Sequence, residues 1–519
     1  MSEIDSTAAV NELLAQVPPE PRVREQLSPG QWVKKNLFNS KLNTVITIVL
    51  APITIYLGYR FFRFVFVTGR WEPVRQNLEL FMVARYPRGE RWRILTQLVL
   101  VAGAAGIGTG LVGKRQRIVA AQTGQPLPPR SWRTYASSYW SIVLYVVVLL
   151  AAFTRTFGPL LLTLGCITTG VVGYLIGRAL PGAALPYGWT LAALTGVASF
   201  QVLSGTGGWA WFFTTVALVP AVGAVVAALP ANARLVGAGL GTAAGLVTVI
   251  LKPGWLGGAA IVLGAFALFT ALRGNRVDGA RLGLLVAAGG GVYLLGRAIG
   301  LDGIDWANWG GLHLSLVVAS AAIVLALPLG ILLALGRRSK LPAVRVMSVA
   351  YIEFFRGAPL ISFLLAATFF LGFFLGAGTT LSQITRAIAA ITLFSAAYVA
   401  EVVRGGLNAV SKGQVEAGQA LGLPASKVTR LIVMPQALRA VIPAMVGQFI
   451  SLFKDTSLLT IIGVAEYLGA RDLVHSQNAF RGIGIAETLV FVAFGYWAFT
   501  FTMSRESQRL ERRLGVGQR

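Results

Sequence analysis

The stretch that decides the fold of this chain is Glu416-Ala417-Gly418-Gln419-Ala420-Leu421-Gly422, and Ile432-Val433-Met434-Pro435 follows it after nine further residues. It is polar and basic, whereas the segments before and after it are strongly apolar. Apolar runs of about 20 residues are long enough to cross a bilayer as helices. A folded polar element between two such runs indicates a loop at the membrane face on which another protein docks.

The local geometry of this loop follows from its residue types. Residues 414–421 favour a short helix, and Gly422 ends it because glycine adopts a positive φ at little cost. Pro424 suits the first position of a second helix, which residues 426–434 continue. Pro435 is expected to end that helix and to begin the next apolar segment. We therefore expect two short helices at a bend, lying across the membrane face as one rigid body.

The composition indicates a membrane protein. Of the 519 residues, 55% are hydrophobic and only 13% are charged, whereas soluble proteins have about 25% charged residues. The net charge of +25 comes from 45 Lys and Arg against 20 Asp and Glu. These basic residues lie in short loops between apolar runs, which is the orientation signal of an inner-membrane protein. We therefore expect no nucleic-acid partner.

The residue types that bind metals or form disulfides are few in this sequence and lie far apart. Cys166 is the only cysteine and lies inside an apolar run, so no disulfide is expected. His313 and His475 are far apart in the sequence, and neither has a nearby Cys or His. The sequence therefore indicates no metal site, no catalytic residue and no bound cofactor.

The apolar runs predict an all-α, polytopic membrane helical bundle of about 14 transmembrane helices. An even number places both termini in the cytoplasm, which agrees with the basic loops. Residues 68–93, between the first two spans, are expected to form a polar external loop, although they hold six Arg and three Glu. The expected spans are 42–66, 94–113, 138–154, 158–177, 188–204, 209–229, 235–251, 255–272, 281–299, 312–336, 347–376, 384–404, 437–460 and 484–503.

The chain divides by composition into six parts. They are a cytoplasmic polar segment (1–40), two first spans (41–134), a Gly-, Ala- and Leu-rich block of spans (135–280), a span with an external loop (281–311), a C-terminal membrane domain (312–505) with a basic loop (405–435), and a basic cytoplasmic tail (506–519). The glycines of the middle block favour close helix packing. Its spans hold almost no acidic residue, which argues against a proton-coupled carrier there.

The spacing of the opening stretch resembles the EAA loop of type I ABC importer permeases. Gly418 stands where the second Ala is usual, and Met434 where Leu is usual. Three further motifs look like polar amino-acid permeases, and the similarity covers about residues 309–505. The motifs are residues 353–360 (Glu-Phe-Phe-Arg-Gly-Ala-Pro-Leu), residues 397–406 (Ala-Tyr-Val-Ala-Glu-Val-Val-Arg-Gly-Gly) and residues 454–458 (Lys-Asp-Thr-Ser-Leu).

Weaker similarity to the general L-amino-acid permeases lies at residues 32–44 and 86–93, and the block 135–280 departs from that pattern like an insertion. The resemblance implies the permease subunit of an ATP-driven amino-acid importer in a bacterial inner membrane. It also implies two cytoplasmic ABC ATPase subunits, a second permease chain and a periplasmic amino-acid-binding protein. A heterodimer of permeases is favoured over a homodimer, because the general amino-acid permeases usually work as pairs.

No Gly-x-x-x-x-Gly-Lys-Ser/Thr run is present, so we expect ATP hydrolysis in a separate chain and no enzyme activity in this one. The resemblance assigns the contact with that ATPase to the EAA-like loop. Glu416 can make a charge-assisted contact with a basic group of the partner. The coupling residues implied are Glu416, Ala417, Gly418, Gly422, Ile432 and Pro435.

Charged residues at membrane depth are costly, so they invite a functional interpretation. An amino acid carries one carboxylate and one ammonium group, and a path with Arg356 on one side and Glu401 or Asp455 on the other could recognise both. Arg356 begins a Gly-Pro interruption at which a helix can break. The alternative is that these charges pair with one another and hold the bundle together. The candidate substrate-path residues are Arg356, Glu401, Arg404, Lys454 and Asp455.

Three alternatives stay open. The solute could be an opine or a polyamine, and the middle spans could have a separate role as an enzyme or a scaffold. Asp302, Asp305, Trp306 and Trp309 could form an outer rim for a binding protein or simply anchor the chain at the interface. The transported amino acid, the pairing of the permease, the role of the inserted spans and the number of spans between 135 and 180 do not follow from the sequence.

Overall fold

A computed structural model describes residues 28–124, 140, 142–149, 158–180, 229–251, 255–298, 303–371 and 381–514, with single residues 195, 202, 222 and 226. Most of the expected spans 188–204 and 209–229, and also Asp302, lie outside these residues. The chain divides into two compact units, residues 1–70 and residues 71–519.

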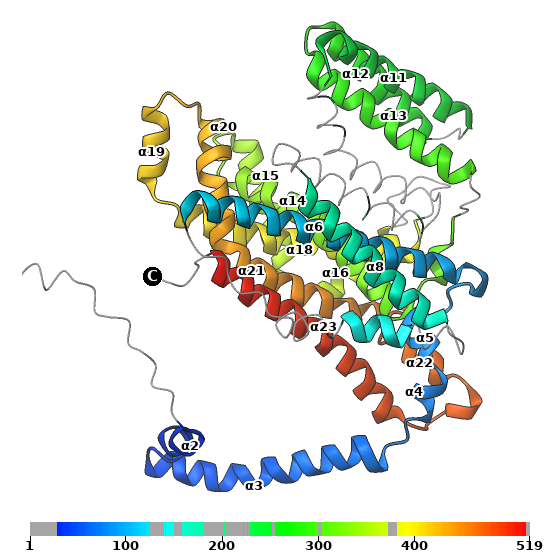
Figure 1. Ribbon diagram of the computed structural model, residues 1–519, viewed down its shortest axis with the longest axis vertical. Coiled ribbons are helices and arrows are strands. Elements are labelled where there is room, and N and C mark those ends of the chain that lie inside the picture. Colours follow the sequence, from blue (N-terminus) through cyan, green and yellow to red (C-terminus); the bar gives the residue numbers. More distant parts are fainter. Residues whose placement is uncertain are drawn as a thin grey trace, which may run out of the picture. The chain divides into compact units, whose positions relative to one another are not determined.

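The described part of the first unit, from residue 28 onward, consists of a short amphipathic helix and a long apolar one (Figure 1). Helix α2 (Pro29–Leu37) begins at Ser28, whose hydroxyl accepts a hydrogen bond from the Gln31 amide while the Gln31 side chain bonds back. Helix α3 (Lys41–Arg63) continues as the π-helical turn η1 (Phe64–Thr68). Residues 41–68 are long and apolar enough to cross a membrane, and none of their most apolar part is buried. They confirm the expected span 42–66.

In its described part, the second unit consists of helices joined by turns and short irregular segments, and its one β-type pairing is an isolated bridge between Gly311 and Glu466. Across both units, the described residues contain seven helices that are long and apolar enough to cross a membrane, or eight if one bent pair counts as a span. These seven lie at seven of the expected spans. The all-α polytopic prediction is confirmed, whereas the total of about 14 spans stays a prediction.

Four long helices form the C-terminal bundle: α14 (Gly311–Arg337), α18 (Gln383–Ala409), α21 (Met434–Asp455) and α23 (Ile485–Leu514). Helices α18 and α21 are antiparallel. Gly406 of α18 lies against Ala437 of α21 at one end, and at the other end the side-chain amide of Gln383 donates to the carbonyl of Ile462, just beyond α21. We call these the loop end, which carries the coupling loop 405–435, and the far end, which carries residues 304–315 and 463–484.

Helix α14 connects both ends. Its first residue, Gly311, donates its amide to the Ala465 carbonyl at the far end (2.8 Å), and Arg338, just past its last residue, donates to the Leu407 carbonyl at the loop end (3.2 Å). The far-end connections are short helices: η4 (Trp306–Asn308), η6 (Thr456–Ile462), α22 (Ala470–His475) and η7 (Asn478–Phe480). Each end has its own cluster of buried side chains.

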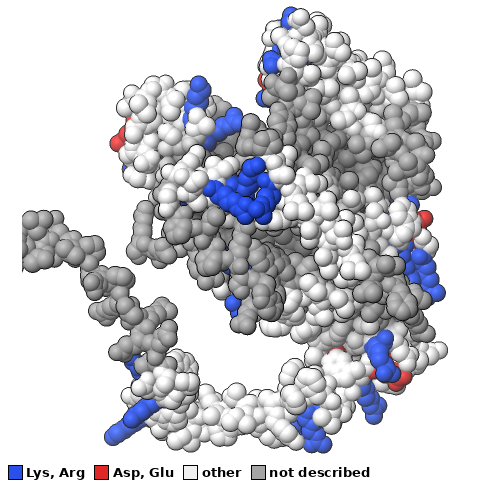
Figure 2. Space-filling model, viewed as in Figure 1, with Lys and Arg blue, Asp and Glu red and all other residues white. Residues whose placement is uncertain are grey.

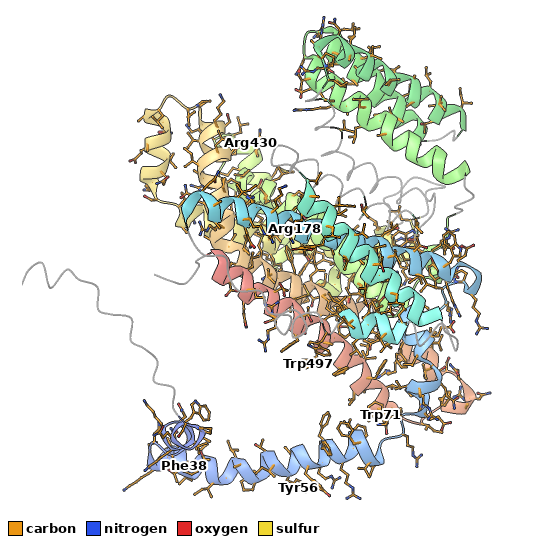
Figure 3. All side chains as sticks on the ribbon, in the orientation of Figure 1. Phe38, Tyr56, Trp71, Arg178, Arg430 and Trp497 are labelled. Atoms are coloured by element: carbon orange, nitrogen blue, oxygen red, sulfur yellow. The ribbon has the colours of Figure 1, made fainter. Side chains whose placement is uncertain are left out.

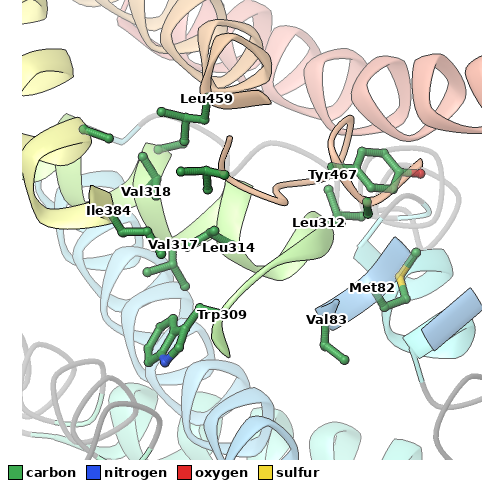
Figure 4. Packing of buried hydrophobic residues seen from close by; sticks show 14 of the residues in the cluster. Met82, Val83, Trp309, Leu312, Leu314, Val317, Val318, Ile384, Leu459 and Tyr467 are labelled. Carbon is green, nitrogen blue, oxygen red and sulfur yellow. The ribbon is translucent and has the colours of Figure 1, made fainter. Parts of the chain in front are cut away.

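The far-end cluster also contains residues of the segment 68–93, which corrects the prediction of a polar loop there, whereas its external location stays a prediction. This segment folds into α4 (Glu72–Gln76), α5 (Leu78–Val83) and η2 (Arg88–Glu90). Phe81, Met82 and Val83 are buried against α14 and the 463–484 segment, and Figure 4 draws Met82 and Val83 beside Leu312 and Tyr467. The segment is polar on average because of its charged residues, but it contains a short apolar run at 80–83. The average polarity therefore does not predict the burial of this run.

One expected span is bent. Helices α15 (Pro342–Arg356) and α16 (Leu360–Phe369) together cover most of the range 347–376, but their axes differ by 100°. The break falls at Gly357-Ala358-Pro359, because Pro359 cannot donate to the preceding turn and restricts the residue before it. The Gly-Pro interruption in the sequence therefore predicts the break, and the bent pair α15 and α16 lies at the expected span 347–376.

The middle of the chain forms two separate groups of helices. Helix α6 (Arg91–Thr123) packs against α8 (Gly158–Ala179) through glycines: a Cβ on Gly106, Gly110, Gly173 or Gly177 would lie closer than 3.0 Å to the backbone of the other helix. Helices α11 (Ala231–Leu251), α12 (Trp255–Leu272) and α13 (Arg276–Ala298) pack on one another. Close packing is the role expected for these glycines.

Candidate functional site

The coupling loop begins with α19 (Lys412–Ala420), and Gly422 ends this helix as expected. The Gly422 amide donates to the Gln419 carbonyl (2.9 Å) and the Leu423 amide to the Gly418 carbonyl (3.2 Å). These two bonds form a Schellman motif, which needs a residue of positive φ at the position of Gly422. The φ of Gly422 is +73°. The bend is therefore set by backbone hydrogen bonds and by this one glycine.

Helix α19 rests on the second half of the loop through Gly418, its one buried residue. A Cβ on Gly418 would lie 2.8 Å from Cδ1 of Ile432 and 3.1 Å from a methyl group of Val428. The glycine thus allows the two halves to approach closely. Gln436 adds a hydrogen bond to Gln414 (3.3 Å). These contacts support the rigid two-helix element that the spacing predicts.

The second half of the loop differs from the expectation at Pro435. Helix α20 (Ala425–Val428), the π-helical turn η5 (Thr429–Val433) and α21 follow one another without a break, and Pro424 caps α20 instead of opening it. Pro435 therefore does not end the second helix. A proline lacks the amide of a regular turn, and the wider turn at residues 429–433 accommodates it. The loop and the span α21 are one continuous rod.

The outer face of the coupling loop is free in this chain. Glu416 and Ala417 are exposed, as are Leu421 (80%) and Leu431 (62%). Figure 2 shows both acidic and basic side chains on this element, and Figure 3 labels Arg430 on its second half. Sequence reasoning missed the two leucines, although large apolar residues in an otherwise polar loop are a signal for a protein contact.

Three of the five expected substrate-path residues meet in one charged group, the Glu401 cluster (Arg337, Glu353, Arg356, Glu401 and Arg404). Oε1 of Glu401 accepts from Arg337 (2.7 Å), and its Oε2 accepts from Arg404 (2.9 Å). Arg356 lies further away, 3.7 Å from Oε2, with its guanidinium 5.9 Å from the centre of the Tyr398 ring. Arg337 also pairs with Glu353 (3.4 Å).

This arrangement favours the alternative that the charges pair with one another over a path with Arg356 and Glu401 on opposite sides. Arg356 is the least engaged arginine and is 38% exposed. Arg337 was missed as a member, because its position at the end of α14 is also typical of a cytoplasmic loop. Lys454 and Asp455 lie elsewhere, at the far-end terminus of α21.

A carboxylate that sequence reasoning did not single out lies at the far end. Glu466 is completely buried. Its Oε1 accepts from the hydroxyl of Thr460 (2.5 Å) and from the amides of Leu468 and Gly469 (both 2.9 Å). Its Oε2 accepts from Ser315 (3.0 Å) and Tyr496 (2.8 Å). Burial, together with the negative charge of Glu466, raises the pKa of the adjacent Tyr467 well above its ordinary value.

Comparison with known proteins decides the family. Residues 326–516 match the family described as binding-protein-dependent transport system inner membrane component. The probable glutamine ABC transporter permease protein GlnP of Bacillus subtilis (strain 168) is 35% identical over 204 residues, which are 39% of this chain and 91% of that protein. This chain belongs to that family of inner membrane components. The matched residues include the coupling loop, the whole Glu401 cluster and Glu466, whereas α4 to α13 lie outside them.

Two longer relatives are more similar in sequence. The inner membrane amino-acid ABC transporter permease protein YhdY of Escherichia coli (strain K12) is 47% identical over 224 residues, 43% of this chain and 61% of that protein. The glutamate/glutamine/aspartate/asparagine transport system permease protein BztC of Rhodobacter capsulatus is 44% identical over 282 residues, 51% of this chain and 64% of that protein. The chain thus spans less than two thirds of the length of either relative.

A solved structure, titled as an amino acid ABC transporter with histidines, is 30% identical to this permease and aligns with a TM-score of 0.36. The alignment covers 39% of this chain and 92% of that chain. The family and the apolar helices together make this chain a multi-pass inner membrane protein.

Proposed function

We propose that this permease is the membrane-spanning subunit of an ATP-driven amino-acid importer, which receives substrate from a periplasmic binding protein and releases it to the cytoplasm. The observation that carries the proposal is the coupling loop: a rigid bend with an exposed acidic and apolar face, continuous with a transmembrane helix. Such an element can pass a movement of a docked protein into the membrane. The two relatives YhdY and BztC, which are named as transport permeases for amino acids, support amino acids as the substrate.

The partners follow from this role. Two cytoplasmic ABC ATPase subunits dock on the coupling loops of two permease chains, of which the second is a related chain in preference to a copy of this one. The loop end then faces the cytoplasm and the far end faces the binding protein. With about 14 spans, both termini lie in the cytoplasm. ATP hydrolysis belongs to the ATPase chains.

Arg356, at the edge of the Glu401 cluster, is the residue of that cluster that we place in the substrate path. Glu401 holds Arg337 and Arg404 closely, so Arg356 is the arginine with donors left for a substrate carboxylate. The Arg356→Lys variant keeps the charge but loses the planar pair of donors. It is expected to weaken the apparent affinity for substrate more than the maximal rate. Equal affinity and rate for every amino acid tested would remove Arg356 from the path.

The proposal is tested by isolating the complex from native membranes in mild detergent and identifying the copurifying chains by mass spectrometry. The wild-type chain is expected to bring an ABC ATPase with it. Glu416→Lys is expected to lose the ATPase, because it reverses the charge on the exposed face of α19. Gly422→Val should weaken docking as well, since a side chain at φ +73° costs roughly 1–2 kcal/mol and displaces the bend.

Asp278→Lys is the matched control, because it reverses an exposed acidic side chain on α13, outside the coupling loop. This variant should keep the ATPase. Recovery of an intact wild-type chain without any ATPase, under conditions that preserve a known importer, would contradict the proposal.

A further inference from the structure

Glu466 joins three of the bundle helices at the far end, and each donor comes from a different place. Ser315 lies in the first turns of α14, Thr460 lies in η6, which continues α21, and Tyr496 lies in α23. The backbone donors Leu468 and Gly469 fix the turn that leads into α22. One buried side chain therefore holds α14, α21 and α23 in a single arrangement. We call Glu466 and its five hydrogen-bond donors the Glu466 joint.

Neighbouring contacts make this joint close-fitting. The Tyr467 amide donates to the Ser315 hydroxyl (3.2 Å), and Gly311 pairs with Ala465 beside it. Gly311 has a φ of +63°, and a Cβ there would lie closer than 3.0 Å to the Met82 backbone of α5. The joint thus leaves little room for the helix ends to slide past one another.

A carboxylate suits this position because its two oxygens accept hydrogen bonds, and not because a basic side chain pairs with it. A carboxylate accepts hydrogen bonds and donates none, which matches five surrounding donors. In the described part of the chain, no Lys or Arg side chain forms a salt bridge with Glu466. A buried acid without a cation is costly, and an apolar side chain would leave two backbone amides without acceptors. In return for this cost, the hydrogen bonds to Glu466 fix the position of each donor and so of the helix that carries it.

The joint is also mechanically connected to the coupling loop. Helix α21 starts in the loop and is about 33 Å long at 1.5 Å per residue, and η6 continues it directly to Thr460. A movement of the loop along or about this rod reaches Glu466 without an intervening flexible segment. From Glu466 it passes to α14 and α23 through Ser315 and Tyr496.

We propose that Glu466 is a positioning residue for transport: it makes the far ends of α14, α21 and α23 move as one body, so that a movement at the coupling loop opens or closes the far end. This role rests on the proposed importer function. Glu466 itself touches neither substrate nor ATPase in the proposal. Its loss therefore uncouples ATP hydrolysis from uptake without removing the ATPase from the complex.

The test uses the full complex in proteoliposomes and compares uptake, ATP hydrolysis and copurification of the ATPase. Glu466→Leu is expected to lower uptake at least about tenfold and to raise the ATP used per substrate, because all five donors lose their acceptor. Glu466→Gln is expected to stay within about threefold of wild type, since its carbonyl oxygen keeps three donors and hydroxyls can rotate to accept. Ser315→Ala and Tyr496→Phe each remove one donor and should show a partial loss of uptake.

Hydrogen exchange of the Leu468 and Gly469 amides in detergent provides a readout that does not depend on transport. Their exchange should speed up in Glu466→Leu and much less in Glu466→Gln. Unchanged exchange of these amides in Glu466→Leu contradicts the proposed role of Glu466. This result does not depend on whether an ATPase copurifies, so it is distinct from a failure of the importer proposal. If Glu466→Leu does not fold, the other three variants decide.

The proposal is overturned by wild-type coupling in Glu466→Leu, or in both Ser315→Ala and Tyr496→Phe. It is also overturned if Glu466→Leu loses uptake and ATP hydrolysis in equal proportion together with its thermal stability, since that result describes a merely structural residue.

Discussion

Gly418 and Gly422 lie four residues apart in the coupling loop, yet their absent side chains matter for different reasons. At Gly422 space is free and only the backbone conformation excludes a side chain, whereas at Gly418 the backbone is ordinary helix and only space is short. Because the nearest atom to Gly418 is the end of a flexible side chain, Cδ1 of Ile432, the site can adapt to one methyl group. This explains how glycine here replaces the alanine usual at this position of an EAA loop.

A paired substitution tests this interpretation. Gly418→Ala is expected to lower thermal stability slightly, by less than about 1 kcal/mol, because the new methyl group displaces the Ile432 terminus. Ile432→Val removes the obstructing methyl group, so the double variant should regain the stability lost by Gly418→Ala. Gly418→Leu, which no movement of Ile432 can accommodate, should lose the ATPase altogether. Additive losses in the double variant would contradict the packing argument.

The Glu401 cluster provides a second prediction at the residue scale. Glu401→Gln removes the common partner of three arginines and leaves their charges facing one another. We expect a loss of roughly 1–3 kcal/mol in the free energy of unfolding, as for hydrogen bonds to charged groups that are only partly exposed. Asp278→Asn is the control: it breaks an exposed pair with Arg281 and should change stability by less than about 0.5 kcal/mol.

Thermal unfolding of the purified chain in detergent measures both variants of this pair. A smaller loss for Glu401→Gln than for Asp278→Asn would show that the cluster does not hold the bundle. That result would favour the other interpretation of the sequence, in which Glu401 recognises the ammonium group of the substrate.

At the scale of elements, glycines decide how closely α6 and α8 approach. Gly110→Leu or Gly173→Leu forces a side chain into the backbone of the other helix and is expected to destabilise the chain by about 1–3 kcal/mol. Gly239→Leu on α11 is the matched control, because a Cβ there has no neighbour within 4 Å. Faster proteolysis of the first two variants but not of the third is the expected outcome. Equal behaviour of all three would mean that α6 and α8 do not pack through glycine.

Sequence patterns predict those elements whose character is local. Apolar runs mark the spans, and Gly422 and Gly357-Ala358-Pro359 mark the bends, because these signals depend on length and on backbone chemistry alone. The burial of α5 is not local: Phe81 is buried because α14, the segment 463–484 and Phe491 of α23 lie around it. The same holds for Glu466, whose donors come from residues 30 to 151 positions away as well as from its own turn.

At the scale of the whole molecule, two described parts of the inserted block make different contacts. Trp140 packs against Trp497 and Phe494 of α23, and the Tyr145 hydroxyl lies 3.1 Å from Nδ1 of His313 in α14. Residues 140–149 thus belong to the permease bundle, although the sequence groups them with the insertion. By contrast, α11 to α13 pack on one another, and Ala280 of α13 is buried together with Val222 and Val226.

This division predicts which part of the insertion can be removed. Deletion of residues 205–300, replaced by a short polar linker, takes out four of the expected spans and so preserves the orientation of α14. Uptake is expected to remain within about threefold of wild type, because none of the described members of the two end clusters lies in this range. Deletion of 135–280, in contrast, removes Trp140 and Tyr145 and uncovers apolar surface on α23, so that chain should aggregate or be degraded. Loss of uptake in a stable 205–300 deletion would assign these helices a part in transport itself.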